Sequence, residues 1–115
     1  MSRPKPTNLP KVKTGDIWLA CLDPKVGSEI QKTRLCVVVS PNGLNPLNTF
    51  IVVPMTTGSH PTRFRPKIAF EGKEGLLLPD QIRTVARARM IRRMGVIDDK
   101  TQGELLSTLR TMFED

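Results

Sequence analysis

Several residue types are scarce in this 115-residue chain, and each scarcity excludes a class of site. His60 is the single histidine, which excludes a histidine-rich metal centre. The two cysteines, Cys21 and Cys36, lie in apolar runs without CxxC or Cys/His spacing, so we expect reduced, buried thiols and no disulfide framework. Aromatic residues make up only 4% of the chain, and the core must therefore be mainly aliphatic.

Long apolar runs and familiar catalytic motifs are also missing. No run approaches the roughly 20 apolar residues of a membrane-spanning helix. Residues 1–13 carry three prolines and four basic residues but no apolar segment of the signal-peptide kind, so we expect a flexible basic arm and a cytoplasmic protein without membrane attachment. The sequence shows no Ser/His/Asp arrangement, no phosphate-binding glycine loop and no dinucleotide fingerprint.

What the chain does have is positive charge. Lys and Arg total 18 against 11 Asp and Glu, which gives a net charge of +7 and a pI near 10.0. Such a balance attracts polyanions, with nucleic acid as the first candidate and an acidic protein as the second. The densest basic stretch would serve either partner, and it contains Arg83, Arg87, Arg89, Arg92 and Arg93.

Short β-branched runs separated by turn residues predict a mainly β domain over residues 14–115. We expect polar loops at 23–33 and 57–62 and a hairpin turn at 71–75. An apolar stripe of helical period between 104 and 113, capped by Asp98 or Asp99, predicts a C-terminal helix. The fold class is therefore a small antiparallel barrel with a C-terminal helix. Strands are predicted at 17–22, 34–40, 49–53, 67–70, 75–78, 82–85 and 91–96, with a short helical turn at 86–90.

The side chains left for catalysis are arginine, threonine and carboxylates, and this set suits cleavage of RNA. RNA supplies its own nucleophile, the 2′-hydroxyl, so the protein needs only to orient groups, stabilise charge and move protons. A guanidinium fork matches two phosphate oxygens, and a hydroxyl adds a further hydrogen bond. Arg34 opens one predicted strand and Thr56 closes another. If the two strands are neighbours, both side chains lie at one rim of the barrel.

Several short motifs follow one another in order over residues 14 to about 113. They are Gly15-Asp16-Ile17-Trp18, Asp23-Pro24, Val26-Gly27-Ser28-Glu29, Arg34 followed by Val37-Val38-Val39-Ser40-Pro41, Val53-Pro54-Met55-Thr56-Thr57, and Asp80-Gln81-Ile82-Arg83-Thr84. In this order they resemble the MazF/PemK toxin ribonucleases. This resemblance implies an SH3-like plasmid-maintenance-toxin barrel of the CcdB/PemK type. It also implies a homodimer, a cognate acidic antitoxin and no cofactor or metal.

The activity implied by the resemblance is sequence-selective cleavage of single-stranded RNA. The products would carry 2′,3′-cyclic phosphate and 5′-hydroxyl ends. The catalytic arginine of the family falls on Arg34, which would stabilise the pentacovalent phosphate and serve as acid. The catalytic threonine falls on Thr56, which would bind the scissile phosphate. The loop 23–33 would cover the RNA, with Ser28, Glu29 and Gln31 as contacts.

Two departures from the family pattern affect this prediction. Leu35 replaces the proline that usually follows the catalytic arginine, which changes local stiffness and leaves the chemistry alone. The PemK branch also uses an Arg-x-Asp pair as acid and base. Here the aspartate is present as Asp80, but Leu78 stands at the arginine position. The proton acceptor is therefore open between Asp80, Glu29 and a water-mediated route, and Asp80 also suits a turn after Pro79.

Further RNA contacts are predicted around these residues. Phe64 lies between two arginines, where it suits either stacking on a base or closing the end of the barrel. His60 is given no role. The predicted RNA-binding set is Ser28, Gln31, Thr57, Arg63, Phe64, Arg65, Gln81, Arg83 and Arg87. Two other functions remain as alternatives: a CcdB-like gyrase poison, which does not need the Arg34 and Thr56 pair, and an RNA-binding module without catalysis.

Overall fold

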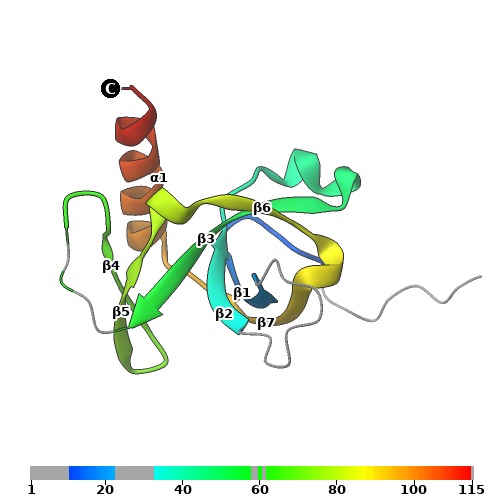
Figure 1. Ribbon diagram of the computed structural model, residues 1–115, viewed down its shortest axis with the longest axis horizontal. Helices are drawn as coiled ribbons and strands as arrows, with labels where there is room; N and C mark the ends of the chain where they lie inside the picture. Colours follow the sequence, from blue (N-terminus) through cyan, green and yellow to red (C-terminus); the bar gives the residue numbers. More distant parts are fainter. Residues whose placement is uncertain (1–10, 23–32, 58–59, 61, 115) are drawn as a thin grey trace, which may run out of the picture.

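The structure is a computed structural model that describes residues 11–22, 33–57, 60 and 62–114 (Figure 1). Within these residues, seven antiparallel strands form one sheet that curls into a half-open barrel, and a long helix follows the last strand. In chain order the elements are β1 (Asp16–Cys21), β2 (Thr33–Val38), η1 (Asn42–Leu47), β3 (Thr49–Thr57), β4 (Lys67–Phe70), β5 (Lys73–Leu77), η2 (Pro79–Gln81), β6 (Arg83–Ala86), η3 (Arg87–Arg89), β7 (Met90–Val96) and α1 (Asp99–Glu114).

Strand β3 joins the two halves of the sheet, whose order is β4-β5-β3-β2-β1-β7. Its first part pairs with β6 and β2, and its last three residues pair with β5. Pro54 lies where the partners change, the kind of place at which a strand tolerates a residue without an N–H group. The sequence predicted this strand to end at Val53. It continues instead to Thr57, because β5 takes over as its partner.

The β4–β5 hairpin is tighter than predicted. Its turn consists of Glu71 and Gly72, whose φ angles are 51° and 75°, and two successive positive φ values are typical of a two-residue type I′ turn. Strand β5 therefore begins at Lys73, ahead of the predicted 75–78. The 3₁₀ helix η1 was not predicted. Val12, assigned to the flexible arm from the sequence, is buried in the core at 3% exposure.

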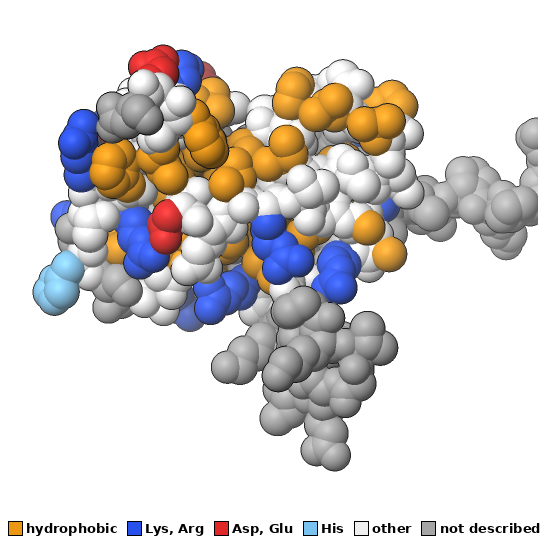
Figure 2. Space-filling view, turned by 45° about the horizontal axis from the view of Figure 1, so that its top comes forward, with side chains coloured by type: hydrophobic (Ala, Val, Ile, Leu, Met, Phe, Trp, Pro, Cys, Tyr) orange, Lys and Arg blue, Asp and Glu red, His pale blue; other side chains and the backbone are white. Residues whose placement is uncertain are grey.

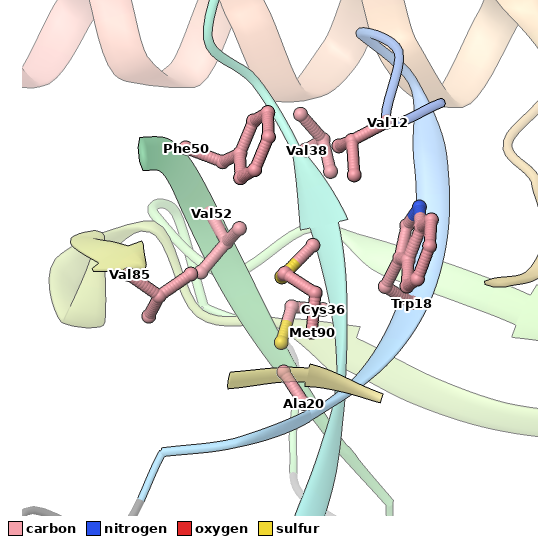
Figure 3. Packing of buried hydrophobic residues seen from close by; sticks show 9 residues of the cluster. All are labelled: Val12, Trp18, Ala20, Cys36, Val38, Phe50, Val52, Val85 and Met90. Atoms are coloured by element: carbon pink, nitrogen blue, oxygen red, sulfur yellow. The ribbon is translucent and has the colours of Figure 1, made fainter. Parts of the chain in front are cut away.

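Two apolar clusters lie on opposite faces of the central strands. Alternate residues of β2 and β3 enter each cluster, so both faces of these strands are covered, as their unbroken apolar runs predict. Trp18, Ala20, Cys36 and Val52 project into the first cluster from three neighbouring strands (Figure 3). The second cluster is covered by α1. Its members are Ile17, Val37, Val53, Met55, Ile68, Leu77, Ile97, Leu105 and Leu109.

Helix α1 begins at Asp99, as the predicted cap at Asp98 or Asp99 requires. The Asp98 side chain caps it by accepting a hydrogen bond from the Thr101 N–H at 2.7 Å. This bond holds the pKa of Asp98 below its ordinary value. Leu105 and Leu109 are buried, whereas Phe113 is 73% exposed, so only the first part of the predicted apolar stripe packs onto the sheet.

Asp16 at the start of β1 is a buried carboxylate with three partners. One oxygen accepts hydrogen bonds from the Lys13 N–H (2.9 Å) and Trp18 Nε1 (3.3 Å), and the other faces Arg93 Nε at 3.3 Å. Asp16→Ala would leave the indole N–H buried without an acceptor, so we expect a loss of about 1–3 kcal/mol of unfolding free energy in urea. Glu104→Ala on exposed α1 is the control and should stay within about 0.5 kcal/mol. A loss no larger than in that control would contradict this role.

Candidate active site

The fold brings Arg34 and Thr56 to the same end of two neighbouring strands. The β2–β3 register pairs Val38 with Val52, Val37 with Val53 and Cys36 with Pro54. Continuing this register by two residues sets Arg34 opposite Thr56. Both residues line one cavity of about 350 Å³ at this end of the sheet. Arg34 is exposed and Thr56 is half-buried, so the guanidinium is open to a ligand.

The alternation of side chains also places Arg83 on this side of the sheet. Arg83 pairs with Val52, a member of the first cluster, and Arg34 shares a face with Cys36 of the same cluster. The Cys36 thiol lies near both guanidinium groups. Burial raises its pKa to about 12, and the positive charges of Arg83 and Arg34 act in the opposite direction. Arg34 and Arg83 therefore both act on the same buried thiol.

The raised pKa of Cys36 predicts a low reactivity of its thiol toward alkylating agents, and it predicts that the free energy of unfolding depends on pH. Because the folded-state pKa is raised from 9.0 to about 12, the folded chain keeps this proton at pH values where the unfolded chain loses it. The contribution of Cys36 to the free energy of unfolding is therefore fully present below pH 9, and it is lost as the pH rises toward 12.

We therefore expect iodoacetamide at pH 8 to leave Cys36 unmodified in the folded protein and to alkylate it in urea. Between pH 9 and 12, Cys36→Ala should lose less stability than the wild type, measured by urea unfolding. Rapid alkylation of folded Cys36, or identical pH profiles for the two proteins, would contradict the prediction.

Three arginines of the predicted basic stretch make specific bonds as well as supplying charge. Arg83 donates to the Leu22 carbonyl at 2.6 Å, and Arg89 donates to the Cys21 carbonyl at 3.2 Å. Arg87 donates to a backbone carbonyl at 3.1 Å and stacks over Trp18, 5.0 Å from the ring centre. The bonds from Arg83 and Arg89 hold the end of β1. Figure 2 shows several Lys and Arg side chains along the lower edge of the molecular face in view.

The cavity is completed by the β4–β5 hairpin, which the sequence did not connect with the site. Apolar walls come from Leu35, Met55, Ile68 and Phe70, all of which belong to or pack against the second cluster. The exposed rim is formed by Thr33, Thr57, Glu71, Lys73 and Glu74. The charged turn Glu-Gly-Lys-Glu-Gly was visible in the sequence, but nothing local indicates that it packs beside Arg34.

Gly75 is required where β5 approaches β3. A Cβ at Gly75 would overlap the Thr56 carbonyl oxygen and would lie 3.3 Å from the Thr56 carbonyl carbon. The obstacle is backbone, which cannot move aside as a flexible side chain can. The absence of a side chain at Gly75 thus determines how closely β5 packs against Thr56.

Asp80 is paired with an arginine distant in sequence. Its carboxylate accepts two hydrogen bonds from Arg65, from Nε at 3.0 Å and from Nη2 at 2.7 Å, and the hydrogen bond from Arg65 lowers the pKa of Asp80. Leu78, at the arginine position of the PemK pattern, is buried at 2% exposure. Asp80 and Gln81 are exposed, and neither is among the described residues that line the cavity. Arg65 is therefore the guanidinium partner that the motif at 78–80 lacks.

The remaining predicted residues are spread around this region or lie outside the described residues. Arg63 stacks on Phe64 with its guanidinium carbon 5.0 Å from the ring centre, and Phe64 is half-buried. Ser28, Glu29 and Gln31 fall outside the described residues.

In the described ranges no group of three or more His, Cys, Asp or Glu side chains is arranged to hold a metal ion. The same ranges contain no helix with the length and hydrophobicity needed to cross a membrane.

Comparison with known proteins places this arrangement in a family. Residues 13–113 match the family described as "PemK-like, MazF-like toxin of type II toxin-antitoxin system". The chain is 32% identical over 109 residues to "Endoribonuclease PemK" of Escherichia coli, covering 89% of this chain and 82% of that protein. It is 33% identical over 107 residues to "Endoribonuclease toxin ChpB" of Escherichia coli K12, covering 87% and 92%.

Solved structures confirm the expected fold class, a mainly β half-barrel with a C-terminal helix. MazF from Deinococcus radiodurans (Form-I) superposes with a TM-score of 0.76 at 20% identity, covering 95% of this chain and all of that one. MazF in a MazE-MazF structure (Form-II) from the same organism gives a TM-score of 0.78 at 20% identity, covering 90% and 96%.

Proposed function

This chain belongs to the PemK-like, MazF-like toxins of type II toxin–antitoxin systems and is an endoribonuclease of that family, and we propose that it cuts single-stranded RNA without a metal ion. The proposal names the attack of a ribose 2′-hydroxyl on the neighbouring phosphate as the reaction. The observation that carries it is the meeting of Arg34 and Thr56 at one cavity edge.

The proposed reaction exchanges one phosphorus–oxygen bond for another. The 2′-oxygen forms a bond to phosphorus, the bond to the 5′-oxygen breaks, and the products carry a 2′,3′-cyclic phosphate and a 5′-hydroxyl. Negative charge grows on the non-bridging oxygens in between. Arg34 offers two parallel N–H donors to those oxygens and Thr56 a hydroxyl donor, both held by neighbouring strands.

Two protons must move in this reaction. The proton of the 2′-hydroxyl passes to a base, for which Glu29 and Asp80 are the proposed carboxylates. A proton also passes to the leaving 5′-oxygen, for which Arg34 is the proposed donor. The Arg65 guanidinium favours the ionised form of Asp80, which can accept a proton but is a weaker base for it. Comparing the pH–rate profiles of Glu29→Gln and Asp80→Asn would assign the base, because removing it eliminates the acidic limb.

RNA binding is proposed to extend over the arginines of the basic stretch between Arg83 and Arg93. Its positive charge supports a salt-dependent hold on phosphates, and Phe64 supports stacking on a base. The proposed contacts remain Ser28, Gln31, Thr57, Arg63, Phe64, Arg65, Gln81, Arg83 and Arg87.

The proposed partners are a second copy of this chain and an acidic antitoxin, and the proposed place of action is the cytoplasm. Structures of similar fold include a mycobacterial endoribonuclease "in complex with its cognate antitoxin". The net charge of +7 supports an acidic polypeptide as the inhibitor, because such a chain would compete with RNA for the same arginines.

The test is cleavage of a long unstructured RNA by the purified protein in EDTA. We expect cuts at a restricted set of sites. The 5′-hydroxyl ends should need phosphorylation by a kinase before they can be ligated, and the 2′,3′-cyclic phosphate ends should need removal of the phosphate before they can be extended or ligated. An absolute requirement for a divalent metal would overturn the mechanism. RNA binding without any cleavage would favour the non-catalytic alternative, and growth arrest through gyrase with intact RNA would favour the CcdB-like one.

A further inference from the structure

The Arg83 side chain joins two strands that are not neighbours in the sheet. Its Nη1 atom donates a hydrogen bond of 2.6 Å to the Leu22 carbonyl, 61 residues away in sequence. We propose that Arg83 is a positioning residue for Arg34: it holds the end of β1, and β1 in turn holds Arg34 in the strand register. This proposal rests on the proposed function, since it concerns how the group assigned to the phosphate is held in place.

The strand register determines the direction in which the Arg83 side chain leaves β6. Arg83 is paired with Val52 on β3, and both Val52 and Val85 belong to the first cluster. Opposed residues and residues two apart on a strand share one face of a sheet, so Arg83 leaves β6 on the face of the first cluster. Strands β3 and β2 lie between β6 and β1. The bond to Leu22 therefore spans the inside of the curled sheet (Figure 1).

The buried Cys36 thiol supports this course of the side chain. Cys36 lies in the first cluster, two residues from Arg34 on β2, and the positive charge of Arg83 acts to lower its pKa. Arg83 is half-buried, and within the part of the chain that the structure describes no carboxylate forms an ion pair with it. The Leu22 carbonyl is thus the acceptor that fixes the guanidinium, at the strand end that carries Arg34.

The end of β1 is also the place where Arg34 is held. Arg34 is paired with Ala20, and the β1–β2 ladder ends one pair later, at Cys21. The Leu22 carbonyl lies just beyond this last pair. A hydrogen bond from a charged donor is stronger than one between neutral groups, so the bond from Arg83 secures a strand end that would otherwise open readily.

A positioning role and a direct phosphate contact predict different kinetics. A shift near 1 Å in the backbone that carries Arg34 would lower the rate of the chemical step, while the other basic side chains would still bind RNA. Removing a phosphate contact would instead weaken binding and reduce its dependence on salt concentration. The value of kcat at saturating RNA, compared with the salt dependence of affinity, separates the two roles.

The experiment compares the wild type with Arg83→Met, which keeps the length of the side chain without its donors, and with Arg83→Lys. Arg110→Met, on exposed α1, removes the same charge and is the control. We expect kcat to fall about 100-fold in Arg83→Met and to stay within about threefold in the control. Arg83→Lys should lie between the wild type and Arg83→Met, because its ammonium group can donate to the same carbonyl but reaches less far.

Amide hydrogen exchange provides a readout that does not depend on cleavage. Residues 33–38, which form β2, should exchange about tenfold faster in Arg83→Met than in the wild type, and the control should leave their exchange unchanged. If Arg83→Met does not fold, the same two measurements on Arg83→Lys decide. A kcat and an exchange rate equal to those of the wild type would then overturn the proposal.

The outcomes also separate this proposal from the function on which it rests. If Arg83→Met keeps its kcat and loses only affinity and salt dependence, Arg83 is a phosphate contact alone and the proposal is wrong. Unchanged exchange of residues 33–38 in a folded Arg83→Met protein would overturn it as well. If the wild type cuts no RNA, the proposed function fails, and the exchange measurement still tests whether Arg83 holds the end of β1.

Discussion

Replacing Arg34 with alanine is expected to lower the rate of RNA cleavage by about 10²–10³-fold, the usual cost of removing one pre-positioned donor to a transition-state oxygen. Arg34 is exposed at the cavity edge, and Thr56 lines the same cavity. RNA binding should fall far less, because many other basic side chains remain. The measurement is single-turnover cleavage alongside RNA affinity at one fixed salt concentration.

Two further variants make the Arg34 prediction specific to geometry. Arg34→Lys keeps the charge but loses the planar fork, so its rate should lie between those of the wild type and Arg34→Ala. Arg110→Ala, which removes an exposed arginine from α1, should cleave within about threefold of the wild type despite the same loss of charge. Cells expressing Arg34→Ala should grow, whereas the wild type should arrest them. Cleavage by Arg34→Ala at a rate close to that of the wild type would contradict the assigned role.

The second large effect is expected from a single methyl group. Gly75→Ala places a Cβ against the Thr56 carbonyl, so either β5 or the end of β3 must shift. Displacements near 1 Å in a catalytic group cost about 10²-fold in rate, and overpacking costs about 1–3 kcal/mol in stability. We expect kcat to fall about 100-fold at a temperature at which the variant is still folded.

The control for Gly75→Ala is the same substitution in open space. Gly103 lies on α1, and apart from the adjacent helix backbone nothing lies within 4 Å of an added Cβ. Gly103→Ala should therefore leave cleavage unchanged and raise the unfolding free energy by up to about 1 kcal/mol. A folded Gly75→Ala protein with wild-type kcat would show that β5 does not position Thr56. Circular dichroism and urea unfolding of both variants keep a folding defect distinct from a catalytic one.

The overall fold was largely predictable because its signals are local. β-branched runs with both faces apolar indicated central strands, and the two clusters on either side of β2 and β3 explain that pattern. The apolar stripe and Asp98 indicated the final helix. Most errors fell at strand boundaries, where pairing partners decide, and two others were the unpredicted η1 and the buried Val12. Thr57 became the end of β3 only because β5 continues the ladder past Pro54.

The candidate site divides in the same way. The sequence alone identifies Arg34 and Thr56, because both lie at the ends of predicted strands and both match the family motifs. Their shared cavity depends on long-range pairing. The hairpin residues Glu71, Lys73 and Glu74 carried no such signal, because their approach to Arg34 follows from two successive strand pairings, of β5 with β3 and of β3 with β2.

The sequence by itself indicated the class of protein: its abundant arginine and single histidine favoured an RNA substrate, and its ordered motifs resembled the toxin family. The tertiary structure alone decided which groups face one another. It gave Asp80 a partner in Arg65, fifteen residues away, and it directed Arg83 to the backbone at the end of β1. The physical reason is that composition and periodicity act over a few residues, whereas salt bridges, close backbone approaches and cavities form between segments that only the folded sheet brings together.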